Sequence, residues 1–250
     1  MHFLKGGTTE IVASAAGRDF IESDLARHGE FSGIKRPAQR YTVTKWAQAF
    51  ERLQYPILHP KPGVVREQSQ TDLGIMIIQT PGHTPDELAW YDTEEKHLYV
   101  GDSFYYEGTD RMPVIWPKYG DLVEWAYSMQ KLQTFVASEN ARLAKAVMEE
   151  SDDEEDEWVT VAAPRRVKVS CAHQTTGADG EKIFDEVLTF FWRVVNGDVP
   201  VVEEYTHDRE VYIKWRDEGE GAENKLSFLS PGRLVDEART FFAGTKCLST

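Results

Sequence analysis

One stretch, Thr80 to Asp102, constrains the fold of this chain more than any other, because it places two candidate metal ligands beside a predicted hairpin. His83 follows a Pro-Gly pair, and Asp102 follows a strand-like run and a glycine. Residues 87–91 and 97–100 have the composition of two short strands, and the polar residues between them are typical of a turn. A hairpin brings the residue before its first strand close to the residue after its second. We therefore expect His83 and Asp102 to lie side by side.

The segments Thr80-Pro-Gly-His-Thr84 and Leu98-Tyr-Val-Gly-Asp102 resemble motifs of the metallo-β-lactamase superfamily of metal-dependent hydrolases. The resemblance implies an αββα sandwich that holds one or two zinc or iron ions at its edge. The family's ligands come from a His-x-His-x-Asp-His motif, a Gly-His pair, a bridging Asp and a late His. The matching positions here are His83 for the Gly-His pair, Asp102 for the bridging Asp and His173 for the late His.

The first motif of the family has little counterpart in this sequence. The segment Met1-His2-Phe3-Leu4-Lys5-Gly6-Gly7 is similar to the end of that motif, whose last His is followed by paired glycines, so His2 is the residue that could match. The two preceding His of the motif would lie before Met1, and Met1 stands where the motif has its Asp. On this resemblance we expect the N-terminal strands of the sandwich to be missing, and we expect His2 as the fourth candidate ligand.

The candidate ligands have a chemical rationale. Neutral imidazole binds zinc at about 2.0 Å, and catalytic zinc sites keep one coordination position open for water. A carboxylate such as Asp102 can bridge two ions, so Asp102 is also the predicted catalytic residue. A bound metal polarises a carbonyl and lowers the pKa of its water to ~7 in favourable zinc sites. The resemblance therefore implies hydrolysis of an ester, thioester, lactone or lactam bond by a metal-bound hydroxide, with zinc as the expected cofactor and iron as the alternative.

Each of these residues alone has an ordinary structural interpretation. A single His at the end of a strand is more often a hydrogen-bonded surface residue than a metal ligand. Asp102 could be a turn residue, and Cys171, near His173, could ligate a metal but is more typical of a small buried side chain. Asp86 and Glu87 could act as acids or could support His83, although turn and strand-edge roles are the default. The occurrence of the three candidates together and in this order favours the family interpretation.

Composition limits the class of protein. The chain has 250 residues, of which 41% are hydrophobic, and we predict one α/β (α+β) domain over residues 1–250. The net charge is −14, and a solvated, mobile insertion is predicted at about 149–157, where the acidic run has too little apolar surface to pack. The rest of the chain is only mildly acidic. A nucleic-acid partner is therefore not expected, because such binding requires clustered Lys and Arg.

Partners and compartment follow from the same features. No apolar run approaches the length of a membrane span, so no membrane partner is expected. Cys171 and Cys247 have no repeated spacing, which favours a reducing, cytoplasmic compartment without a disulfide framework. The expected partner is a small-molecule substrate. The sequence does not indicate an oligomeric state.

The rest of the chain predicts alternating strands and helices. Strands are expected at 10–14, 74–79, 166–170, 211–215 and 225–229, and helices at 18–28, 45–53, from 121, from 181 and at 232–242. Asp179 is expected to cap the helix from 181. The loop 103–120 carries several aromatic residues, which could line a substrate cleft or could pack beneath the loop.

Two hypotheses of function follow. The first is a metal-dependent hydrolase, as the resemblance implies. The second is a truncated or non-catalytic relative that keeps the scaffold without a complete metal site, because at most one ligand of the first motif is present. Metal binding by the chain would distinguish the two.

Overall fold

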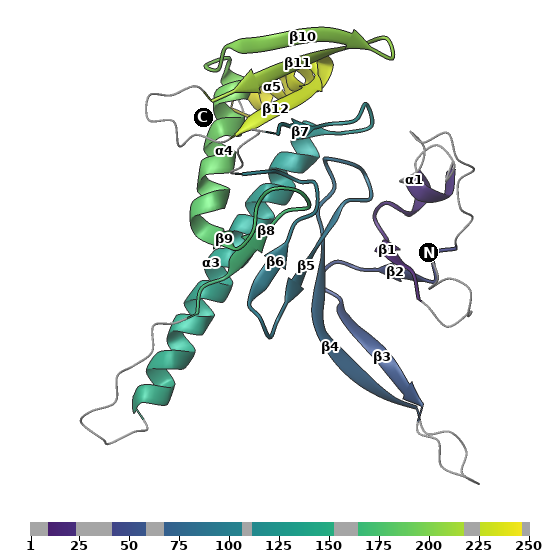
Figure 1. The fold of residues 1–250 in the computed structure, drawn as a ribbon, viewed down its shortest axis with the longest axis vertical. Coiled ribbons are helices and arrows are strands. Elements are labelled where there is room, and N and C mark those ends of the chain that lie inside the picture. The colour runs from purple at the N-terminus through teal and green to yellow at the C-terminus, as the bar shows by residue number, and fades with distance from the viewer. Residues whose placement is uncertain are drawn as a thin grey trace.

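The computed structural model describes residues 10–23, 42–58, 68–106, 112–152, 165–217 and 226–246. These residues form an α+β fold with a six-stranded sheet, a four-stranded sheet and a separate pair of strands (Figure 1). The predicted α+β class is confirmed, because helices pack on separate, largely antiparallel sheets.

The six-stranded sheet contains the predicted hairpin. Its strands, in spatial order, are β3 (Arg52–Leu58), β4 (Gln68–Gln79), β5 (Leu88–Asp92), β6 (His97–Tyr99), β8 (Lys168–Ser170) and β9 (Ala178–Asp179). The hairpin of β5 and β6 pairs Trp90 with Tyr99, as the sequence predicts. Strands β6 and β8 are parallel, so their carboxyl ends lie at the same edge of the sheet. This edge receives both Asp102 and His173.

The four-stranded sheet lies nearer the C-terminus. Its spatial order is β10 (Val201–His207), β11 (Glu210–Arg216), β12 (Ser227–Pro231) and β7 (Val114–Ile115). Helix α5 (Gly232–Lys246) contacts β11 and β12. The sequence predicts β11 and β12 but not β10, because every residue of β10 is exposed and the strand lacks the alternation of a half-buried strand.

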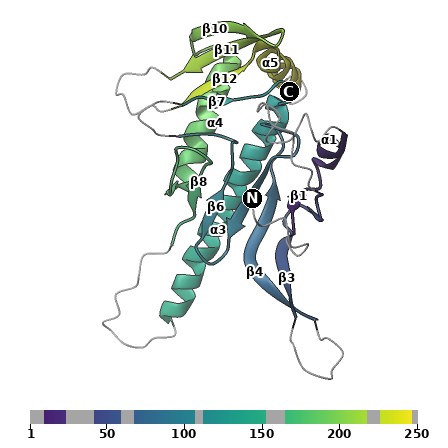
Figure 2. The same cartoon turned by 45° about the vertical axis from the view of Figure 1, so that its right-hand side comes forward.

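Two long helices supply a large part of the core. Helices α3 (Leu122–Asp152) and α4 (Gly180–Asn196) run side by side along the six-stranded sheet in both views (Figures 1 and 2). The apolar stripe predicted for the helix from 121 is buried: Leu122, Trp125, Ala126, Met129, Leu132 and Val136. Helix α3 continues to Asp152 and so includes the start of the acidic run, and the rest of that run lies outside the described residues.

Capping fixes the ends of α4. The Asp179 carboxylate accepts a hydrogen bond from the Lys182 backbone N–H at 3.2 Å, so the predicted N-cap is confirmed. At the other end, the backbone N–H of Gly197 donates to the carbonyl of Val194 at 3.1 Å. Helix α4 therefore begins immediately after β9 and follows the loop that carries His173.

One predicted helix is wrong. Residues 45–53 form β2 (Lys45–Ala47) and the start of β3 instead of a helix. Strand β2 pairs in parallel with β1 (Val12–Ser14), which is followed by the short helix α1 (Arg18–Ser23). Phe50 has a φ of 59°, which an α-helix cannot include, and its side chain is 48% exposed. Backbone pairing with distant segments overrides the local helical pattern here.

An ion-pair cluster joins the segment before β8 to the start of α4 and gives a pH-dependent prediction. Arg166 donates to the Asp179 carboxylate at 2.9 Å and also pairs with Glu181, and Arg166 is the main cause of the lowered pKa of Asp179. A lowered carboxyl pKa contributes stability above the unfolded value, about 3.9, and this contribution is lost as the pH falls through the folded value. We expect Arg166→Gln to lower the free energy of unfolding by about 0.5–1 kcal/mol at pH 7, because the pair is partly exposed.

The measurement for Arg166→Gln is urea denaturation at pH 7 and at pH 3. The difference from the wild type should shrink at pH 3, where the carboxyls become protonated. Lys145→Gln is the control, since Lys145 pairs with Glu149 in an exposed i,i+4 contact on α3. A wild-type advantage as large at pH 3 as at pH 7 would show that the Arg166 contribution is not electrostatic.

Candidate functional site

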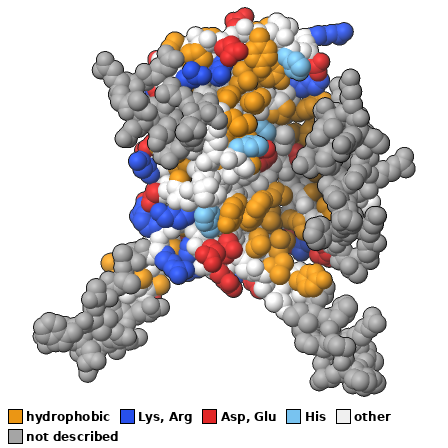
Figure 3. Space-filling model, viewed as in Figure 1, with side chains coloured by type: hydrophobic (Ala, Val, Ile, Leu, Met, Phe, Trp, Pro, Cys, Tyr) orange, Lys and Arg blue, Asp and Glu red, His pale blue; other side chains and the backbone are white. Residues whose placement is uncertain are grey.

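The two loops that leave β6 and β8 bring two candidate ligands into contact. Asp102 follows β6 and His173 follows β8, and the parallel pairing of the strands places both loops at one edge of the sheet. The Nε2 atom of His173 lies 3.3 Å from Oδ1 of Asp102. Both side chains are partly exposed, so a small molecule in solvent can reach them. In the space-filling view, hydrophobic side chains gather in two areas of one face, and histidine and acidic side chains lie between them (Figure 3).

Tyr105 completes a three-residue cluster around the Asp102 carboxylate. Its hydroxyl donates a hydrogen bond to Asp102 Oδ1, the same oxygen that faces His173, and its ring packs edge-on against the His173 ring at 5.1 Å. Burial raises the pKa of Tyr105, and the neighbouring Asp102 carboxylate raises it further, so the hydroxyl stays protonated and donates. No sequence pattern indicated this role, because Tyr105 is one of several aromatic residues in the loop.

His83 lies nearby but has its own partners. Its Nε2 atom is 2.9 Å from the Ile115 carbonyl oxygen, and a carbonyl only accepts, so the Nε2 carries a proton. Its Nδ1 atom lies 3.7 Å from Oε2 of Glu87, too far for a hydrogen bond. Burial alone would lower the pKa of His83, but the interaction with Glu87 and the charge of Asp102 outweigh it, so the pKa lies above the ordinary value.

Glu87 links the His83 segment to the Asp102 segment. Its Oε1 atom accepts a hydrogen bond from the Asp102 backbone N–H at 3.1 Å, while its Oε2 atom faces His83. Gly101 makes this approach possible, because it has a φ of 58° and a Cβ at this position would lie 2.3 Å from Glu87 Oε1. Glu87 thus supports both candidate residues, and it does so from the position directly before β5.

Cys171 has the surroundings of a packed thiol side chain in this arrangement. Burial raises the pKa of its thiol to about 12, so the thiol is protonated at neutral pH. Its backbone N–H donates to the Thr175 carbonyl at 3.0 Å, which closes the loop that carries His173. The arrangement favours the interpretation of Cys171 as a small packed side chain.

The aromatic residues of the loop after β6 divide between the two interpretations. Phe104 and Trp116 are fully buried and pack in the core. Tyr106 instead lines a cavity beside the candidate site. The loop therefore both contributes to the core and borders a cavity.

The described residues do not form a complete metal site as they lie. Among them, no three His, Cys, Asp or Glu side chains gather closely enough to hold an ion. Asp102 and His173 form a pair, and the protonated Nε2 of His83 is bound to a carbonyl, whereas His2 lies outside the described residues. Nδ1 of His83 is the part of this cluster that is buried without a hydrogen-bond partner, so it is the atom that remains open to a further ligand.

The chain is an α+β protein with His and Asp side chains at one edge of a sheet. Residues 24–144 match the family model described as the metallo-beta-lactamase superfamily. The matched part is just under half of the chain, and it contains His83 and Asp102 but not His173. The resemblance predicted from the sequence is confirmed for this part.

Several solved structures are similar to the chain, and two of them serve as examples. The metallo-beta-lactamase family protein TTHA1429 from Thermus thermophilus is 14% identical, with 82% of this chain and 60% of that protein covered and a TM-score of 0.43. TTHA1623, solved in a di-iron-bound form, is 19% identical, with 50% of this chain and 51% of that protein covered and a TM-score of 0.33.

One curated protein is similar to about half of the chain. It is the putative transcription factor avaE of Aspergillus versicolor, which is 22% identical over 134 residues. The alignment covers 54% of this chain, and the chain spans only one third (33%) of that relative's length. Within the described part of the chain, no helix has the length and apolar character needed to cross a membrane.

Proposed function

We propose that the chain is a metal-dependent hydrolase that cleaves an ester, thioester, lactone or lactam bond, with Asp102 and His173 as the described part of its metal site. The observation that carries the proposal is the contact of these two side chains, 3.3 Å apart at the exits of neighbouring parallel strands. The family match over residues 24–144 supports the same chemistry, because members of this family are largely metal-dependent hydrolases. Zinc and iron are the candidate ions, since imidazole and carboxylate suit both.

The chain's own residues would hold the Asp102 carboxylate in place. The Tyr105 hydroxyl and the backbone contact of Asp102 with Glu87 fix its orientation. Ligand orientation of this kind typically changes metal affinity or activity by about 10–100-fold when it is removed. Tyr105 and Glu87 are therefore proposed as positioning residues for Asp102.

A second candidate is favoured by a different observation. The Ile115 carbonyl accepts a hydrogen bond from Nε2 of His83, and the Tyr105 hydroxyl donates one to Oδ1 of Asp102. The protein itself thus satisfies atoms that an ion would use. This arrangement would suit a relative that keeps the scaffold and does not hydrolyse substrates. The two candidates differ in whether the chain takes up a metal ion.

The deciding experiment measures the metal content and the esterase, thioesterase and lactonase activities of the chain after loading with zinc or with iron. We expect metal uptake, and we expect Asp102→Asn and His173→Ala each to lower the metal affinity and kcat/KM at least about 10–100-fold, the range known for the residues that merely orient ligands. His207→Ala is the matched control, because His207 is exposed on β10 in the other sheet. No uptake and no turnover in the wild type would reject the hydrolase and leave the scaffold candidate.

A further inference from the structure

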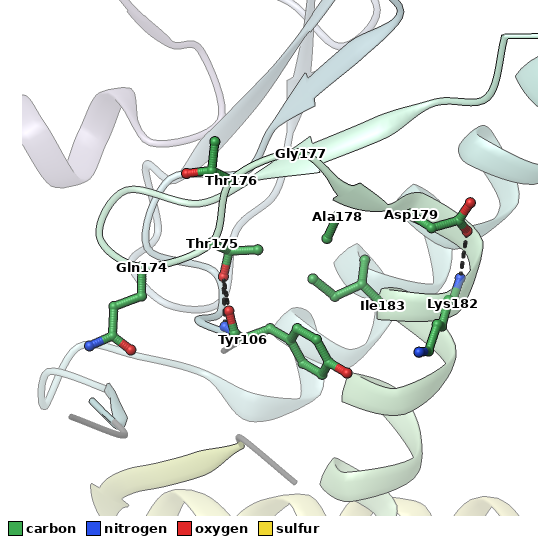
Figure 4. A pocket seen from close by; sticks show the side chains of 9 residues that line it. All are labelled: Tyr106, Gln174, Thr175, Thr176, Gly177, Ala178, Asp179, Lys182 and Ile183. Atoms are coloured by element: carbon green, nitrogen blue, oxygen red, sulfur yellow. Dashed lines mark hydrogen bonds between the residues drawn. The ribbon is translucent and has the colours of Figure 1, made fainter. Parts of the chain in front are cut away.

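A cavity of about 430 Å³ lies beside the candidate site and is walled by the same two loops. Tyr106 comes from the loop that carries Asp102, and Gln174 directly follows His173 in the other loop. The first turn of α4 supplies Lys182 and Ile183 to a third wall (Figure 4). A molecule bound in this cavity would therefore lie next to the loops that carry the candidate ligands.

Hydrogen bonds between the two loops hold the cavity open. The Thr175 hydroxyl donates to the Tyr106 carbonyl at 2.6 Å and accepts from the Tyr106 backbone N–H at 2.7 Å. Thr175 is buried, so these bonds are shielded from water. The two walls are joined before any ligand arrives, as is usual for small-molecule sites.

The lining has an apolar part and a cationic end. The Tyr106 ring and the side chains of Ala178 and Ile183 provide the apolar surface. Figure 4 shows the Lys182 amine and the Tyr106 hydroxyl on the same side of the cavity. Such a lining suits a ligand with an apolar body and a polar group at one end.

Of the two charged groups in the lining, Lys182 is the one that can meet an anion at that end. The Asp179 carboxylate is already held by the Arg166 guanidinium at 2.9 and 3.4 Å. The Lys182 ammonium pairs with Glu186 at 3.8 Å, and its side chain is 71% exposed, so this pair contributes little stability. Lys182 can therefore leave Glu186 and pair with an anionic ligand at little cost in stability.

We propose that this cavity binds the part of a substrate that carries a carboxylate on an aromatic or aliphatic body, with Lys182 as the residue that selects the anion. The inference rests on the proposed function in one respect, that the ligand is a substrate. Binding itself is independent of hydrolysis. The cavity volume falls within the usual range of small-molecule sites, roughly 300–1,000 Å³.

The binding test uses phenylacetate as the probe and phenylacetamide, its neutral counterpart, as the comparison. Both are titrated into the full chain labelled with ¹⁵N and followed by amide chemical shifts. Phenylacetate should bind with a Kd of roughly 1 mM, in keeping with its small number of heavy atoms. Lys182→Gln should weaken phenylacetate binding about tenfold, as expected for the loss of one charge-assisted contact, and leave phenylacetamide unchanged. Lys145→Gln, a change of the same charge on the exposed end of α3, should affect neither probe.

Further measurements distinguish failure of this inference from failure of the proposed function. His173→Ala should lower kcat/KM at least about 10–100-fold but leave the Kd of phenylacetate unchanged, so a loss of activity alone does not count against the binding site. If the wild type hydrolyses esters, Lys182→Gln should lower kcat/KM for a carboxylate-bearing ester about tenfold more than for its neutral analogue. Equal affinity of wild type and Lys182→Gln for phenylacetate, or shifts confined to residues away from the cavity, would overturn the inference.

Discussion

Gly82→Ala should lower the free energy of unfolding by roughly 2–6 kcal/mol, because the added methyl group both overpacks the core and strains the backbone. A Cβ at Gly82 would lie 2.3 Å from the Trp125 Cα and 2.4 Å from its N and Cβ atoms, and no flexible side-chain end can move to relieve these contacts. Gly82 also has a φ of 142°, which L-residues rarely adopt. Overpacking costs about 1–3 kcal/mol and backbone strain about 1–3 kcal/mol.

The measurement for Gly82→Ala is urea denaturation followed by circular dichroism, with the midpoint and the slope both fitted. Gly244→Ala is the matched control: Gly244 lies in α5, and a Cβ built there meets no described atom within 4 Å apart from its chain neighbours and the backbone of its own helix. We expect the control to change stability by less than about 1 kcal/mol. A Gly82→Ala protein that unfolds at the wild-type midpoint would show that the segment before His83 does not pack closely on α3.

The close packing at Gly82 explains why the Pro-Gly turn precedes His83. The Gly82 carbonyl accepts a hydrogen bond from the Asp121 backbone N–H at 2.8 Å, and the Asp121 side chain caps the first turn of α3. The start of α3 thus fixes the position of the His83 segment. The sequence indicated a turn at this glycine and a helix from 121, but it did not indicate that the helix packs against the turn.

Local patterns predicted the elements whose stabilising contacts are close in sequence. The hairpin of β5 and β6, the stripe of α3 and the Asp179 cap each depend on residues a few positions apart or on one short turn. The prediction for residues 45–53 was wrong because the contacts that stabilise β2 are distant in sequence. Strand β2 pairs with β1, and the Ala47 carbonyl accepts a hydrogen bond from Gln79, 32 residues away. Only the folded chain brings these segments together.

The candidate site, like the fold, was predictable only where local sequence patterns or the family resemblance indicate it. The strand exits at Asp102 and His173 follow from local patterns together with the family resemblance, and the structure places the two side chains in contact. The partners of His83 and the role of Tyr105 could not be predicted, because a backbone carbonyl at Ile115 and a loop hydroxyl have no sequence signature. These partners decide which atoms are free for an ion, so side-chain geometry was needed to judge the metal site.

Trp125→Ala should destabilise the protein by about 3–5 kcal/mol, the range for removing a buried aromatic side chain. Trp125 is fully buried, with ring contacts to Trp116 at 5.6 Å, Phe191 at 5.1 Å and Phe228 at 5.7 Å. It therefore joins α3 to α4 and to the four-stranded sheet. Tyr127→Ala is the control on the same helix, and we expect less than about 1 kcal/mol because Tyr127 is about half exposed.

Trp125→Phe separates the packing role of this residue from its polar role at the site. The indole Nε1 donates a buried hydrogen bond of 2.7 Å to the carbonyl of Ser103, the residue directly after Asp102. Phenylalanine keeps a ring in the core but leaves that carbonyl unpaired, which costs about 1–3 kcal/mol. Urea midpoints should therefore fall in the order Tyr127→Ala, Trp125→Phe, Trp125→Ala from highest to lowest. If Trp125→Phe matches the wild type in stability, the hydrogen bond to Ser103 does not hold the Asp102 loop, and packing alone accounts for the loss in Trp125→Ala.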